Sequence, residues 1–317
     1  MKRGLIGIGL GLLAILGIPS AGFAAGEIIT DDIPRFWQAW DKSGVNFEPT
    51  VFATEYLENG TPGLKDFIRG RIDSAENLSA TIKSSPNYYA SLRVRSAELE
   101  AMKPEIQRIL DQYSSWYPTA KLPDIYIVIG AMNSGGTASR NGLIIGLDMY
   151  GLTENLPIAE LSEWHRQVLK PVSHIPAIVA HEMVHFQQAE FDDRSLLAQA
   201  LREGIADFIG EQLSGKTINE HLKAYAEPRE RQLWQDFQLV MAGDNYQGWL
   251  YGGTATKERP ADLGYWMGYR IARSYYLNHG ASQDAISDML QMTDAKAFLQ
   301  KSRYNSGNTF GTPATRN

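Results

Sequence analysis

Residues 175–191, Ile-Pro-Ala-Ile-Val-Ala-His-Glu-Met-Val-His-Phe-Gln-Gln-Ala-Glu-Phe, carry the pattern that decides the fold. Their apolar residues predict a buried helix, and His181, Glu182 and His185 form an H-E-x-x-H motif within it. Residues four apart on a helix share a face, so the two imidazoles can reach one metal ion. Glu182 stands beside that face, where it can act as general base on a metal-activated water molecule. Structural core histidines are the alternative.

A catalytic zinc ion normally has three protein ligands and one open position, so the motif calls for a further ligand. The best candidate is Glu203, eighteen residues after His185. Residues 192–195 predict a turn, and residues 195–213 predict a second helix that returns alongside the first and presents Glu203 to the ion. His174 and His221 are other candidate ligands, with weaker sequence context.

Asp207 follows Glu203 by four residues and shares its helical face. Metal-bound histidines usually donate their second ring N–H to a carboxylate or carbonyl, and Asp207 is placed to orient one of them from outside the ligand set. A solvated carboxylate paired with Arg202 or a lysine is the alternative.

The rest of the pattern predicts an α+β fold that is mostly helical. Helical spacing dominates residues 32–117, and residues 262–277 predict a late helix. Residues 124–129 and 142–147 are rich in β-branched and other apolar side chains and predict a hairpin or two adjacent strands of a small sheet.

The first 24 residues have the features of a secretory signal peptide. Lys2 and Arg3 precede an apolar run over residues 5–18, and small residues end the segment. A retained membrane anchor is the alternative, but the run is shorter than the roughly 20 residues that a bilayer-spanning helix needs. A helical N-terminal region over 25–120, a metallohydrolase domain over 121–305 and a flexible tail over 306–317 complete the predicted organisation.

Composition excludes several classes of partner. The chain has 317 residues, a formal net charge of −6 and no block of basic residues, which argues against nucleic acid and anionic membranes as partners. Without cysteine it has no disulfide, thiolate ligand or cysteine nucleophile. We expect a periplasmic or secreted bacterial protein with no membrane span after signal removal; its oligomeric state is not predicted.

H-E-x-x-H followed by E-G-x-A-D resembles the gluzincin signature. With the later run at 262–269, Asp-Leu-Gly-Tyr-Trp-Met-Gly-Tyr, the chain is similar to a family of bacterial predicted zinc-dependent proteases related to gliding-motility lipoproteins. The resemblance covers roughly residues 122–302. It implies a zincin-like fold with a small twisted β-sheet, an active-site helix and a following helix that carries the glutamate. One departure is the lack of a cysteine to carry a lipid, which argues against a role in gliding.

The resemblance also has implications for substrate binding. In zincins the edge strand before the active-site helix commonly binds the substrate backbone, and residues 135–147 are in that position; the alternative is that they only complete the sheet. A peptidase needs a hydrogen-bond donor to the oxyanion besides the metal. The candidates are Tyr265 and Tyr269, with Arg270 and His174 as further choices.

We therefore expect a metallohydrolase that holds Zn²⁺ and cleaves a peptide or protein substrate in the cell envelope. The His, His and Glu ligand set also accommodates cobalt or manganese. One alternative is a non-catalytic zinc-binding envelope protein that engages a partner through its helical N-terminal region. Another is a hydrolase of a non-peptide amide bond.

Overall fold

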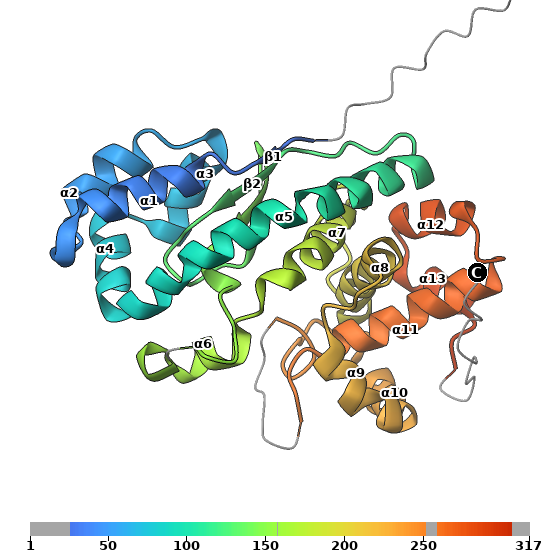
Figure 1. Ribbon diagram of the computed structural model, residues 1–317. Coiled ribbons are helices and arrows are strands. Elements are labelled where there is room, and N and C mark those ends of the chain that lie inside the picture. Colours follow the sequence, from blue (N-terminus) through green and yellow to red (C-terminus); the bar gives the residue numbers. More distant parts are fainter. Residues whose placement is uncertain (1–25, 157, 252–258, 306–317) are drawn as a thin grey trace, which may run out of the picture.

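The computed structural model describes residues 26–156, 158–251 and 259–305 (Figure 1). The predicted signal peptide and the predicted flexible tail lie outside the described residues. Within the described ranges, no helix combines the length and the apolar character that crossing a bilayer requires.

Helices of the N-terminal third pack beside and across a small sheet (Figure 1). Residues that end or begin helices fix their bounds: Ser74 accepts a hydrogen bond from the Asn77 N–H (3.1 Å) as an N-cap, and Pro86 opens the longest helix of the group. The helices are α1 (Asp32–Lys42), α2 (Pro49–Phe52), α3 (Pro62–Phe67), α4 (Ala75–Ser84) and α5 (Pro86–Trp116).

The sheet has the strand order β1-β2-β4-β3. Its strands are β1 (Ile28–Ile29), β2 (Ile125–Val128), β3 (Gly136–Ser139) and β4 (Gly142–Gly146). β1, β2 and β4 are parallel, whereas β3 forms a hairpin with β4 and is an edge strand. Of the two arrangements predicted for the apolar runs at 124–129 and 142–147, the adjacent one is confirmed. The hairpin instead joins β4 to β3, which the apolar pattern does not reveal.

The C-terminal half is helical. α7 and α8 lie side by side, and α11 packs against α8 on the side away from α5 (Figure 1). α7 ends at His185, so the helix predicted over 175–191 is shorter than expected. The helices are α6 (Glu163–Val168), α7 (Ile175–His185), α8 (Leu196–Ser214), α9 (Glu220–Ala226), α10 (Glu230–Val240), α11 (Leu263–Asn278), α12 (Gln283–Leu290) and α13 (Ala295–Ser302).

Glycines allow the backbones around α8 to touch. A Cβ atom added at Gly204 of α8 would lie 2.1 Å from the Gly268 carbonyl carbon of α11, and one added at Gly268 would lie 1.7 Å from the Ala200 oxygen. Such distances are far inside van der Waals contact, so neither helix can carry a side chain there. A Cβ atom at Gly210 would lie 3.0 Å from the His181 nitrogen, which makes the α7–α8 crossing close as well.

A buried carboxylate secures the loop between β2 and the edge strand. Asp148 is 1% exposed and follows β4; it accepts hydrogen bonds from the N–H groups of Gly130 (2.6 Å) and Met132 (2.7 Å). Burial raises the pKa of Asp148 to about 6, although the two N–H groups favour the charged form.

These elements make a mostly helical α+β fold with a small mixed sheet, as predicted. The division at residue 120 stays a prediction. β1 and buried side chains of α1 to α5 nevertheless share one hydrophobic core with the later helices, so the N-terminal region is part of the platform that supports α7.

We expect Gly204→Ala to lower the free energy of unfolding by about 3 kcal/mol, because the added methyl group overpacks a backbone contact. Urea denaturation measures the loss. Gly243→Ala is the matched control, since its Cβ atom would meet only the Val240 oxygen at 3.5 Å. Equal stability of the two variants would contradict the proposed contact.

Asp148 should also make stability depend on pH. Its pKa is raised on folding, so the folded state holds the proton more tightly and stability falls as pH rises from the unfolded pKa near 4 through the folded pKa near 6. Between pH 5 and 7.5 the unfolding free energy of the wild type, relative to Asp148→Asn, should fall by roughly 1 kcal/mol. A difference that is constant over this range would show that Asp148 titrates alike in both states.

Candidate metal centre

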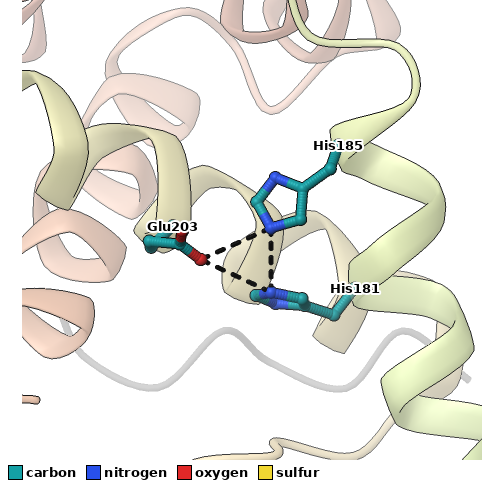
Figure 2. A group of neighbouring side chains, drawn as sticks. All are labelled: His181, His185 and Glu203. Carbon is teal, nitrogen blue, oxygen red and sulfur yellow. Dashed lines mark hydrogen bonds and ion pairs between the residues drawn. The ribbon is translucent and has the colours of Figure 1, made fainter. Parts of the chain in front are cut away.

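α7 and α8 carry the predicted ligands. His181 and His185 project from α7 toward Glu203 of α8, as Figure 2 shows. α8 begins where the sequence predicts it, because the Ser195 side chain accepts a hydrogen bond from the Ala198 N–H (3.2 Å) as its N-cap. α8 runs antiparallel to α7 and therefore brings Glu203 next to both histidines of the motif.

The three side chains converge at their tips. The Nε2 atoms of His181 and His185 are 3.1 Å apart, and Glu203 Oε2 lies 3.6 Å from the first and 3.4 Å from the second. Ligand atoms at about 2.0–2.1 Å from a tetrahedral zinc ion are about 3.4 Å from one another. Among the described residues, these three form the cluster whose ligand atoms can meet around one ion.

Asp207 lies beside the ring of His181. The His181 Nδ1 atom lies 2.8 Å from Asp207 Oδ1, and neither atom has another partner among the described residues. Asp207 Oδ2 accepts a hydrogen bond from the Asn219 amide (2.7 Å). The contact favours the proton on Nδ1 and leaves Nε2 free to bind an ion.

His185 has an outer contact that the sequence did not suggest. Gln188 Oε1 lies 2.8 Å from His185 Nδ1, while the Gln188 amide donates to the Arg202 carbonyl (2.8 Å). Because the amide end is committed to Arg202, the Oε1 end accepts from Nδ1–H, and Nε2 of His185 is again left free. A His-x-x-Gln spacing at the end of α7 was the available signal.

The charges of the cluster shift the pKa values of His181 and Glu203 in opposite directions. Burial by itself lowers the pKa of His181, but Asp207 and Glu203 raise it well above the usual value. Burial by itself raises the pKa of Glu203, but the two histidines hold it well below its usual range. Two imidazole nitrogens and a carboxylate oxygen face one another here, and His181 and Glu203 are buried. Such an arrangement is stable only with a cation or a shared proton between the three atoms.

Glu182 faces the edge of the sheet. It is half-buried, and a Cβ atom added at Gly136 of β3 would lie 3.4 Å from Glu182 Oε1. After burial, the charge of Glu182 is the main cause that raises the pKa of the buried Tyr150. The Glu182 carboxylate therefore lies against β3, which pairs with another strand on one side only in the part of the chain that the structure describes.

The predicted donor residues occupy different places. Tyr265 is half-buried on α11, and burial followed by the charge of Glu203 raises its pKa. Tyr269 instead interacts with Glu211 and stacks on Trp266, with ring centroids 5.9 Å apart. These residues line a cavity of about 310 Å³ whose wall also includes Asp207.

The remaining candidates lie away from the converging tips. His174 is the residue before α7 and His221 lies on α9; burial, followed by the charge of Lys170, lowers the pKa of each. Arg270 forms an ion pair with Glu230 (3.0 Å). None of the three belongs to the cluster that can hold a metal.

Sequence reasoning missed Tyr251, which lies beside Glu203. Burial, followed by the charge of Glu203, raises the pKa of Tyr251 to about 12, and its hydroxyl donates to Gln199 Oε1 (3.3 Å). It follows α10 in an irregular segment, where no motif identifies it.

One family model matches most of the chain. Its description is "Gliding motility protein GldB", and it aligns with residues 44–238 and 250–306. The matched ranges include all of α7, α8 and α11 and therefore every residue of the cluster. No curated protein and no solved structure matches the chain significantly.

Proposed function

The chain belongs to the family of the gliding motility protein GldB, and we propose that it is a zinc-dependent hydrolase of the cell envelope that cleaves peptide bonds. The observation that carries this proposal is the convergence of two histidine Nε2 atoms and one carboxylate oxygen within 3.1–3.6 Å. The Nδ1 atom of each histidine lies 2.8 Å from an oxygen outside the cluster, on Asp207 for His181 and on Gln188 for His185.

His181, His185 and Glu203 would hold the ion. Three protein ligands leave one tetrahedral position open, which is typical of catalytic zinc, whereas structural sites are closed by four. Bound there, zinc supplies a Lewis acid that brings the pKa of a water molecule toward neutrality. The nitrogen and oxygen ligands also suit cobalt and manganese.

Glu182 would move the proton. Its carboxylate adjoins the ligand pair on α7 but belongs to neither outer contact, so it is free to accept a proton from water and pass it to the leaving amine. In amide hydrolysis water first adds to the carbonyl carbon, and the C–N bond breaks afterwards. The acyl product keeps the hydroxyl of the water, and the amine product takes the proton.

The open edge of β3 favours a polypeptide over other amides. β3 pairs with β4 on one side, and an extended peptide could add to its other side through backbone hydrogen bonds. Gly136 carries no side chain where the strand passes Glu182, so a bound backbone could approach the carboxylate closely.

Glu182→Gln tests the central claim. We expect this variant to bind about one zinc ion per chain, as the wild type does, because Glu182 is outside the ligand set. Hydrolysis of a mixed peptide library should fall by about 10²–10⁴-fold, since the general base is lost. Elemental analysis and mass spectrometry of the peptides provide the two readouts.

Glu190→Gln is the matched control, because Glu190 is an exposed carboxylate shortly after α7. It should keep both zinc and activity. If the wild type binds no zinc under zinc-replete conditions, the proposal is overturned. Zinc without cleavage of any peptide would favour a non-catalytic envelope protein or a different amide substrate.

The outer contacts should set metal affinity. Gln188→Leu and Asp207→Asn should each weaken zinc binding by about 10–100-fold, because the ring of a histidine ligand loses its orienting partner. Competition with a chromogenic chelator measures the affinity. Gln235→Leu, at an exposed position on α10, is the control. Unchanged affinity in both site variants would mean that the ligand rings are held by packing alone.

A further inference from the structure

Tyr251 is held in place by its surroundings. Its backbone has a φ of +62°, a left-handed conformation that side-chain-bearing residues seldom adopt. The preceding Leu250 and Trp249 are buried, and the Trp249 carbonyl accepts a hydrogen bond from the Gly264 N–H (2.7 Å) near the start of α11. The ring of Tyr246 packs against that of Tyr251 at 5.7 Å. These contacts fix the position of the Tyr251 backbone and the direction in which its side chain leaves it.

The hydroxyl reaches the face of α8 that carries Glu203. It donates to Gln199 Oε1 (3.3 Å), and Gln199 is one helical turn before Glu203. The amide end of Gln199 donates to the Asp193 carbonyl (3.1 Å), so its oxygen stays turned toward Tyr251. A bond of 3.3 Å is long for an O–H donor, so a better acceptor can replace it.

The cluster itself offers a substrate only acceptors. The Nε2 atoms of His181 and His185 face Glu203 and would bind the ion, and Glu182 and Glu203 present carboxylates. When water adds to an amide carbonyl, the carbonyl oxygen gains negative charge and needs a hydrogen-bond donor. The donor must therefore come from another element.

Among the described residues, two of the predicted donors are already engaged by carboxylates. Tyr269 interacts with Glu211, and Arg270 is paired with Glu230. Tyr265 is half-buried and so is more enclosed than Tyr251, a residue that is 52% exposed. Exposure matters because a substrate arrives from solvent.

We propose that Tyr251 is a catalytic residue whose hydroxyl leaves Gln199 and donates a hydrogen bond to the carbonyl oxygen of the substrate at the metal centre. Tyr251 keeps its proton throughout; the proton removed from water passes through Glu182. The role in hydrolysis rests on the proposed function, whereas the contact between Tyr251 and a ligand of the metal does not.

Tyr251→Phe removes the hydroxyl and keeps the ring. On a peptide that the wild type cleaves, we expect kcat to fall by about 10²–10³-fold. KM should change by less than about twofold, and zinc content should be unchanged. The control is Tyr246→Phe, which loses a hydroxyl bonded to the Arg194 carbonyl outside the site (2.7 Å) and should keep wild-type kinetics.

A second readout does not need turnover. Acetohydroxamate binds metals through oxygen atoms that also accept hydrogen bonds, and its binding to the cobalt-substituted protein can be followed by visible absorption. Tyr251→Phe should weaken this binding about tenfold and leave the spectrum without hydroxamate unchanged, and the Tyr246 variant should bind like the wild type.

The outcomes separate the two proposals. If the wild type cleaves no peptide but Tyr251→Phe still weakens hydroxamate binding, the peptidase proposal fails and the role of Tyr251 in ligand binding stands. If Tyr251→Phe matches Tyr246→Phe in both readouts, the inference is overturned. It is also overturned if Tyr251→Phe loses zinc, because the residue would then act by positioning Glu203.

Discussion

The backbone of α8 touches its neighbours at glycines, and the site depends on those contacts. At Gly204 it meets Gly268 of α11, and at Gly210 it passes the main chain of His181 on α7. Residues between and beside these glycines are thereby held in register with the histidine pair. Glu203 immediately precedes the first contact, and Asp207 lies between the two. A helix held farther away by side chains could not bring both carboxylates to His181.

The same geometry explains why much of the centre could be predicted from the sequence. The spacing of four residues between His181 and His185 is a helical repeat, so one face follows from local structure alone. Glu203 and Asp207 reach His181 only because α8 runs back alongside α7. The turn predicted just before α8 suggested that arrangement. The structure brings both carboxylates close to His181, and their roles with a metal stay predictions.

Other features depend on contacts that sequence periodicity does not encode. β1 consists of only Ile28 and Ile29 and exists because it pairs with β2, nearly a hundred residues later. Gln188 follows the end of α7, where the helical pattern alone predicted continuation. Tyr251 lies in an irregular segment and reaches the site through a left-handed backbone conformation. In each case a long-range contact, and not local propensity, decides the structure.

The edge of β3, which in the described residues pairs only with β4, could also meet another copy of the chain. Unpaired strand edges promote self-association, and proteins limit this with short strands and charged side chains. β3 spans only Gly136–Ser139, and the turn that follows it carries Arg140, whose side chain is 85% exposed. A strand of this length offers few backbone hydrogen bonds to a neighbouring molecule, and the charge of Arg140 disfavours a second copy at the same edge. The fold can therefore leave this edge uncovered without inviting aggregation.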